Sequence, residues 1–289
     1  MTKGTLYICA TPIGNLEDVS YRLKRVLSEV DMIAAEDTRR TLKLLNHLGI
    51  KKPLFSCHRY NENERAQKIL SILEQGKNVA LVSDAGMPCI SDPGEAVVRL
   101  AVASGCSILA VPGPSAALTA LALSCLDTSS FVFTGFLPRE GRKRREAIAA
   151  LSNETRTSIL YEAPHRLLET LQDLQQALGD RKISISRELT KLHEETFRGT
   201  LSSAIEHFQG GVRGEIAIVL EGIHIQKEKR EALPGELEEN LKKWLAQGMT
   251  KKAAAKKAAD VFSISKGEAY MAATKLNRNT GATQGSETI

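Results

Sequence analysis

The sequence predicts an α/β protein with two α/β domains, a parallel sheet followed by a mixed sheet, and a small C-terminal helical domain. In residues 1–127, short apolar runs alternate with helical patterns, which is typical of a parallel sheet. In residues 128–224, two neighbouring strands are joined by a loop too short for a crossover helix, so they must be antiparallel. Beyond residue 235 only short helical patterns follow.

The first domain is expected to place a binding site at one edge of its sheet. Strands are expected at 6–10, 32–35, 54–56, 79–82 and 107–111, and each runs into a loop rich in Gly, Pro or polar residues. The returns to the next strand are plain turns. Ligands of open α/β sheets bind outside the carboxyl ends of the strands. We therefore expect Asp84, directly after the fourth strand, in a ligand pocket; the alternative is a carboxylate that stabilises a turn or caps a helix.

The second domain is expected to begin at residue 128, after a small-residue helix at 116–124. Strands are expected at 131–134, 158–161, 183–187, 197–200 and 215–220, with helices at 164–178 and 204–208. A basic loop and a helix that ends at Leu151 separate the first two strands. The strands around Arg187 and Phe197 are the predicted antiparallel pair.

Residues 225–235 are expected to be a linker, 236–277 a helix-turn-helix-like domain and 278–289 a disordered tail. Thr250 can cap the second helix, and Ser265 with Glu268 has the spacing of a capping box for the third. The basic surface of these helices suits nucleic acid; a helical appendage for packing or dimerisation is the alternative.

Composition narrows the functional class. The 289 residues are 42% apolar, yet no apolar run is long enough to cross a bilayer and no secretory leader is evident, so a cytoplasmic protein without membrane contact is expected. The five cysteines form no C-x-x-C pair and the histidines are dispersed, which favours reduced thiols and no metal site. The net charge of +5 gathers in clusters at 139–145 and 251–257, which indicate either a polyanionic partner or a solvated face.

The loops lack the common nucleotide motifs. No G-x-G-x-x-G follows a strand and no G-x-x-x-x-G-K-[ST] occurs, so neither a Rossmann dinucleotide site nor a P-loop is supported. The loops instead offer backbone groups fixed by Pro and Gly, together with Ser83, Asp84, Ser91, Asp92 and Ser115. This pattern suits a small polar cofactor held by main-chain hydrogen bonds.

Together the loops resemble the bacterial family of small-subunit ribosomal RNA methyltransferases, within the tetrapyrrole methylase superfamily. The motifs occur in order as TPIGNL (11–16), AEDTR (35–39), SDAGMP (83–88) with ISDPG (90–94), PGPSA (112–116), GFLP (135–138), YEAPHR (161–166) and RELTKLHEE (187–195). Met87 and Cys89 depart from the usual Thr and Leu of the family. The resemblance covers residues 5–222 and implies two α/β domains of the tetrapyrrole-methylase type.

The resemblance also implies the cofactor and the partners. The family binds S-adenosylmethionine between the two domains and methylates the ribose 2′-hydroxyl of a cytidine in small-subunit ribosomal RNA, free or within the 30S subunit. It implies a homodimer and a C-terminal domain that grips RNA. The cofactor contacts that it implies are Pro12, Ile13, Gly14, Asp84, Gly86, Met87, Pro88, Ser115, Ala116, Tyr161 and Glu162.

Methyl transfer to a hydroxyl needs an in-line arrangement and benefits from a base. The candidate catalytic residues are Glu188, Lys191 and Asp37. The alternatives are an ion pair between Arg187 and Glu188, and an Asp37 that serves the start of a helix. The candidate RNA contacts are Arg39, Arg142, Lys143, Arg144, Arg145, Arg187, Lys251 and Lys252.

Two other functions remain open from the sequence. A methylase of tetrapyrroles or of protein side chains would share the architecture, although the basic clusters argue against a small macrocycle. A non-catalytic RNA-binding protein would use the C-terminal helices, but it would leave the five decorated strand ends unexplained.

Overall fold

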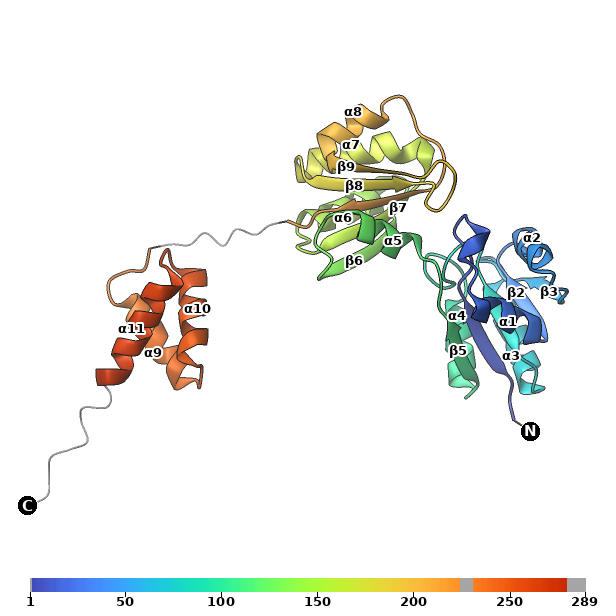
Figure 1. The fold of residues 1–289 in the computed structure, drawn as a ribbon, viewed down its shortest axis with the longest axis horizontal. Coiled ribbons are helices and arrows are strands. Elements are labelled where there is room, and N and C mark those ends of the chain that lie inside the picture. The colour runs from blue at the N-terminus through green and yellow to red at the C-terminus, as the bar shows by residue number, and fades with distance from the viewer. Residues whose placement is uncertain (1, 224–230, 280–289) are drawn as a thin grey trace, which may run out of the picture. The chain divides into compact units, whose positions relative to one another are not determined.

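A computed structural model describes residues 2–223 and 231–279 (Figure 1). Its contacts divide the chain into two compact units, residues 1–223 and 224–289. Among the described residues, no helix is both long enough and apolar enough to cross a membrane.

The first sheet is entirely parallel, as predicted, with the strand order β3-β2-β4-β1-β5. Its strands are β1 (Thr5–Cys9), β2 (Met32–Ala35), β3 (Leu54–Ser56), β4 (Val79–Val82) and β5 (Ser107–Val111). The helices are α1 (Tyr21–Glu29), α2 (Thr38–Leu48), α3 (Glu62–Glu74), α4 (Glu95–Ala103) and α5 (Ala116–Leu123), with a 3₁₀ turn η1 (Leu16–Asp18). Chain connections leave β1 and β4 in opposite directions across the sheet, so the switch point lies between these two strands.

The second sheet is mixed, as predicted, with the order β6-β7-β10-β8-β9. Its strands are β6 (Phe131–Phe136), β7 (Thr157–Glu162), β8 (Lys182–Arg187), β9 (Glu195–Thr200) and β10 (Ile216–Leu220). Only β6 and β7 pair in parallel, and the expected antiparallel pairing of β8 with β9 is confirmed. The helices are α6 (Gly141–Ser152), α7 (Leu167–Leu178) and α8 (Leu201–Phe208), with a 3₁₀ turn η2 (Pro164–Arg166). Residues 142–145, expected in a loop, lie in α6.

Helix α5 joins the two α/β domains. Its buried residues Ala117, Ala120 and Leu121 share a core with Ile159 of β7 and Val219 of β10. The opposite face of the second sheet packs on α6, α7 and α8. The N-terminus of α5 is therefore fixed between the end of β5 and the second sheet, which brings the loops of both domains to a common site.

The described part of the C-terminal unit holds three helices, α9 (Glu236–Ala246), α10 (Lys251–Val261) and α11 (Lys266–Asn279). Leu241, Trp244 and Phe262 form its core with buried alanines. Both predicted caps are confirmed: Thr250 Oγ1 accepts from the Ala253 amide at 3.2 Å, and Ser265 and Glu268 exchange the two hydrogen bonds of a capping box. Most of the predicted linker and tail lies outside the described residues.

Candidate active site

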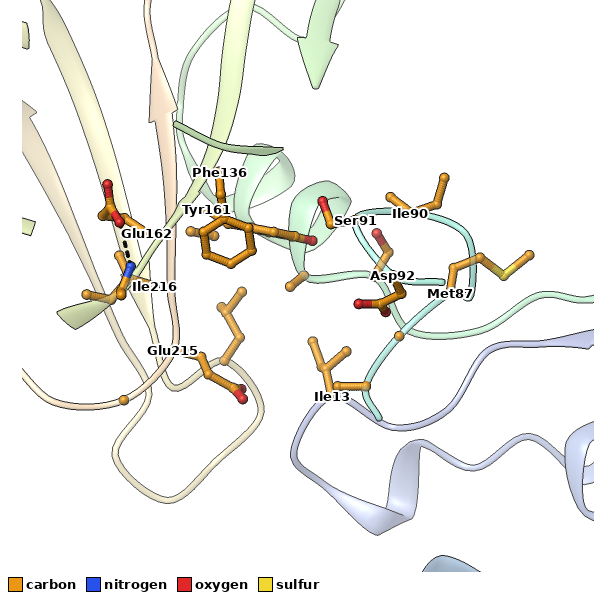
Figure 2. A pocket seen from close by; sticks show the side chains of 18 of the residues that line it. Ile13, Met87, Ile90, Ser91, Asp92, Phe136, Tyr161, Glu162, Glu215 and Ile216 are labelled. Carbon is orange, nitrogen blue, oxygen red and sulfur yellow. Dashed lines mark hydrogen bonds between the residues drawn. The ribbon is translucent and has the colours of Figure 1, made fainter. Parts of the chain in front are cut away.

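A cavity of about 380 Å³ lies between the two α/β domains (Figure 2). This volume is within the range of about 300–1,000 Å³ that small-molecule sites usually have. The first domain contributes the loops that follow β1, β4 and β5, and the second contributes the ends of β6 and β7 and the start of β10. The lining residues are Ile13, Ala85, Gly86, Met87, Ile90, Ser91, Asp92, Ser115, Ala116, Phe136, Tyr161, Glu162, Ala163, Pro164, Leu189, Gly214, Glu215, Ile216 and Ala217.

The cavity brings together most of the predicted cofactor residues, although not all of them. Those that line it are Ile13, Gly86, Met87, Ser115, Ala116, Tyr161 and Glu162. Pro12, Gly14, Asp84 and Pro88 are outside this lining. Pro12 and Asp84 instead line a smaller cavity of about 260 Å³ beside α2.

Asp84 is turned toward the start of α2. Its Oδ1 accepts from the Asp37 amide at 3.0 Å, and its Oδ2 lies 3.4 Å from Arg40 Nε. Burial raises the pKa of this carboxyl, and the hydrogen bond from Asp37 opposes the rise. These contacts match the turn-stabilising alternative rather than the predicted pocket contact.

Asp92 is the acidic side chain that the first domain offers to the cavity, and it was not among the predicted contacts. Figure 2 shows it with Ser91 on one side of the cavity, facing Tyr161 and Glu215 on the other. Burial raises the pKa of Asp92 to about 7, and the nearby carboxylates of Glu36 and Asp84 add to the rise. A carboxylate in a largely apolar cavity favours a ligand that carries positive charge.

An aromatic wall forms the second domain's side of the cavity. Tyr161 packs edge to face with Phe133 at a centroid distance of 5.1 Å and lies 5.6 Å from Phe136. Its hydroxyl accepts from the Ala117 amide at 3.1 Å, which fixes the ring against the N-terminus of α5. Such a wall offers a flat apolar surface to a planar ring.

Glu162 lines the cavity, but its carboxylate is already engaged. Thr170 Oγ1 donates to it at 2.7 Å, the Ala163 amide at 2.8 Å, and Arg166 lies 3.5 Å away. The side chain is 1% exposed. Glu162 therefore holds the end of β7 in place, and a ligand would meet the backbone there.

The loop after β8 forms the rim of the cavity. Lys191 Nζ lies 2.8 Å from Glu188 Oε1 and 3.1 Å from Glu215 Oε2. The hydrogen bond from Lys191 lowers the pKa of Glu188. Burial would lower the pKa of Lys191, but the hydrogen bonds to Glu188 and Glu215 outweigh it and raise that pKa. Lys191 is therefore held as an ammonium, which opposes its predicted role as a base.

This rim touches the first domain directly. The Asn15 amide donates to Thr190 Oγ1 at 3.1 Å. A Cβ on Gly14 would lie 2.6 Å from Lys191 Cγ and 2.8 Å from Thr190 Oγ1, so only glycine allows this approach. Glu188 and Thr190 have positive φ angles, as do Cys89 and Ser91 on the opposite rim. Strained backbone of this kind is concentrated at functional sites.

Asp37 and Arg39 lie away from the interdomain cavity, the space of about 380 Å³ between the two α/β domains. Asp37 caps α2 by accepting from the Arg39 amide at 2.8 Å, and Arg39 Nη2 lies 2.7 Å from Asp37 Oδ2. The hydrogen bond from the Arg39 side chain lowers the pKa of Asp37 to about 2. These contacts match the helix-start alternative and oppose a catalytic role for Asp37.

The predicted RNA contacts divide into exposed and buried groups. Exposed residues are Arg39, Arg142, Lys143, Arg145 and Lys252, and Lys251 is half-buried. Arg144 is buried: it donates to Asp173, Thr170 and the Pro138 carbonyl. The prediction that Arg144 contacts RNA is therefore wrong, because its face of α6 packs on α7. Arg187 pairs with Glu195 at 2.6 Å, and not with Glu188 as the alternative had it.

The chain is similar to known methyltransferases in sequence and in fold. The sequence pattern of the Tetrapyrrole (Corrin/Porphyrin) Methylases matches residues 5–205. The chain is 45% identical over 93% of its length to Ribosomal RNA small subunit methyltransferase I of Halalkalibacterium halodurans, which it covers to 94%. The protein of the same name from Thermotoga maritima is 51% identical over 76% of the chain and is itself covered to 99%.

Solved structures show the same fold at low sequence identity. A diphthine synthase aligns with a TM-score of 0.60 and 15% identity, covering 75% of this chain and 89% of its own. Uroporphyrin-III-C-methyltransferase from Thermus thermophilus aligns with a TM-score of 0.54 and 17% identity, covering 75% and 94%. These two likenesses concern the architecture of the two α/β domains.

Proposed function

The chain belongs to the ribosomal RNA small subunit methyltransferase I family of tetrapyrrole methylases, and on this premise we propose that it methylates the 2′-hydroxyl of a cytidine ribose in small-subunit ribosomal RNA. The methyl donor of the family is S-adenosylmethionine. Four relatives of this name are 42–51% identical over more than three quarters of this chain.

The interdomain cavity suits that donor, and this observation carries the proposal. S-adenosylmethionine combines a planar adenine, a ribose and a sulfonium, and when bound it supplies an electrophilic methyl group. The aromatic wall around Tyr161 offers a surface for the planar ring, and Asp92 offers a negative charge for a cation. Gly86 and Ala116 also line the cavity, so the backbone of both loops borders the space that the donor would fill.

The rim between the domains supplies the residues proposed for catalysis. Holding the acceptor hydroxyl in line with the methyl group contributes most, because orientation alone can supply on the order of 7–11 kcal/mol. We propose that Glu188 accepts the proton of the ribose hydroxyl. Lys191, an ammonium 2.8 Å from Glu188, stabilises the negative charge that develops on the ribose oxygen. A positioned base contributes roughly 10²–10⁴-fold.

RNA binding is assigned to the exposed basic side chains of α6 and of α10 in the C-terminal unit. Arg142, Lys143 and Arg145 are exposed on the first turns of α6, and Lys252 is exposed at the start of α10. Phosphate contacts of this kind give affinity without sequence selectivity. The proposed assembly is a homodimer, which light scattering tests.

A single assay tests the proposed reaction. The protein is incubated with methyl-labelled S-adenosylmethionine and either unmodified small ribosomal subunits, their free RNA, a protein extract or tetrapyrroles. Label is expected in the RNA, in a dinucleotide that begins with cytidine and resists alkali, because a methylated 2′-oxygen cannot attack the neighbouring phosphate. Label in a base, a protein or a macrocycle would contradict the proposal, and binding without any transfer would leave the non-catalytic alternative.

A further inference from the structure

A second cavity, of about 500 Å³, lies where β8 ends and β9 begins, beside the end of α8. Its described lining is mostly polar and consists of Arg187, Glu195, His207, Phe208, Gly210, Gly211, Val212 and Arg213. None of these residues lines the interdomain cavity. The two cavities are therefore built from different residues.

The two cavities adjoin each other through the chain. Arg213 lines the second cavity and the next residue, Gly214, lines the first, so their Cα atoms are about 3.8 Å apart. Arg187 is also paired across the sheet with Ile216, which lines the first cavity. A polymer held at the interdomain cavity would thus pass close to the second cavity.

Arg187 is held in place with most of its donors unused. Its Nε donates to Glu195 Oε2 at 2.6 Å, and Glu195 Oε1 lies 2.9 Å from His207 Nε2. A guanidinium has five N–H donors in a planar fork. Within residues 2–223 and 231–279, the two terminal amino groups of Arg187 donate no hydrogen bond, so both are free to bind a ligand.

Arg213 adds a second guanidinium to the same cavity. Its side chain is exposed, and no hydrogen bond or ion pair joins it to a described residue. The imidazole of His207 stacks on Phe197 at a centroid distance of 4.8 Å and an interplanar angle of 28°, which fixes the remaining wall. Two guanidinium groups against one carboxylate leave the cavity positive, and guanidinium forks match the oxygen atoms of phosphate.

The geometry points to this cavity as a binding site for backbone phosphates of the RNA whose ribose enters the interdomain cavity, with Arg187 and Arg213 as the phosphate ligands. The inference rests on the proposed function, since it takes its ligand from the RNA named there. It assigns Arg213 a role that no sequence motif indicated, and it places the phosphates that Arg187 contacts beside the acceptor nucleotide.

Filter binding of the full-length protein to small ribosomal subunits, over a range of KCl concentrations, tests the inference. Arg213→Gln is expected to weaken binding several-fold and to reduce the slope of log affinity against log salt by about one unit. Arg187→Gln is expected to do the same. Arg25→Gln, which removes an exposed arginine paired with Glu29 on α1, is the matched control and should change neither quantity.

Calorimetry with S-adenosylmethionine separates this inference from the proposed function. Both arginine variants should bind the donor as the wild type does. Unchanged subunit affinity and salt slope in both variants, with a wild type that binds and methylates, would overturn the phosphate site alone. A change of oligomeric state in Arg213→Gln would also overturn it, by assigning the cavity to a contact between copies. A wild type that binds no subunits would instead refute the proposed function.

Discussion

At the scale of single residues, Asp92 is destabilising when it is ionised, and the hydrogen bond with Ser83 offsets only part of the effect of burial. Its carboxyl is half-buried near the carboxylates of Glu36 and Asp84, and its pKa is about 7 against an ordinary 3.8. Between these two pH values the folded chain binds a proton that the unfolded chain does not. The stability that this protonated form contributes is present in full below pH 3.8 and is lost as the pH rises through 7.

We predict that Asp92→Asn stabilises the ligand-free protein at pH 8 and has little effect at pH 4.5. The asparagine keeps the size of the side chain and removes the buried charge that forms above pH 7. Thermal unfolding of both proteins at the two pH values measures the difference. An equal shift of the melting temperature at both would show that the effect is not electrostatic.

The same residue predicts a pH dependence of cofactor affinity with the opposite sign. A sulfonium attracts the ionised carboxylate, so affinity for S-adenosylmethionine should rise up to about tenfold from pH 6 to pH 8, the interval in which a group of pKa 7 ionises. S-adenosylhomocysteine, whose sulfur is neutral, is the matched ligand and should show a smaller rise. Calorimetry would contradict this role if Asp92→Asn kept the wild-type pH dependence.

We predict that replacing Arg144 lowers the stability of the protein, whereas replacing its neighbour Arg145 weakens RNA binding. Arg144→Met removes the hydrogen bonds that the buried guanidinium donates to Asp173, Thr170 and the Pro138 carbonyl, and should cost about 1–3 kcal/mol of unfolding free energy. Arg145→Met removes an exposed charge and should leave stability unchanged while lowering the salt slope of RNA binding. Urea unfolding and filter binding on both variants test the pair, and equal stability losses would refute the distinction.

At the scale of elements, the contact between the loop after β1 and the loop after β8 joins the two halves of the site. The contact depends on Gly14, because a methyl group there would overlap Lys191 and Thr190. We predict that Gly14→Ala displaces the rim loop and lowers the rate of methyl transfer at least tenfold, with a smaller change in cofactor affinity. Gly267→Ala, where the added methyl meets only Ser265 Oγ at 3.8 Å, is the control. A methyl-transfer assay measures the rate, and calorimetry with S-adenosylmethionine measures the affinity. An unchanged rate would contradict the role of this contact.

The sequence predicted which strand ends carry the site, but not which way each side chain points. Strand ends follow from apolar runs and turn residues, and β2, β3, β4 and β5 begin and end where the pattern placed them. The direction of each side chain depends on the backbone of the loop. Cys89 and Ser91 have positive φ angles, which no short pattern of residue types reveals. The loop therefore presents Asp92 to the cavity while Asp84 turns toward α2.

The spacing of apolar residues in α6 indicates that Arg144 is buried. Arg144, Ile148 and Leu151 are spaced i, i+4 and i+7, which is one face of a helix, and all three are buried. A basic run of four residues spans a full turn, so one of them must face inward. A helix that includes residues 142–145 therefore predicts that Arg144 faces the core.

At the scale of the whole molecule, the C-terminal unit has a core of its own. Leu241, Trp244 and Phe262 pack with each other and with alanines of residues 254–273, whereas the other four apolar clusters lie entirely within residues 6–220. The Thermotoga maritima relative is covered to 99% of its length by 220 residues of this chain, so it is about as long as the first unit. We therefore expect residues 1–223 to fold without the rest.

We predict that a protein of residues 1–223 binds S-adenosylmethionine within about twofold of the full chain, because every residue that lines the interdomain cavity lies in it. Its affinity for small ribosomal subunits should fall and its salt slope should flatten, because the exposed lysines of α10 are gone. Lys251→Gln with Lys252→Gln in the full chain is the matched variant and should reproduce part of the loss. Calorimetry and filter binding measure both quantities. A truncated protein that binds subunits as tightly as the full chain would assign the three C-terminal helices to packing or dimerisation, whereas one that no longer binds the cofactor would show that the two units depend on each other.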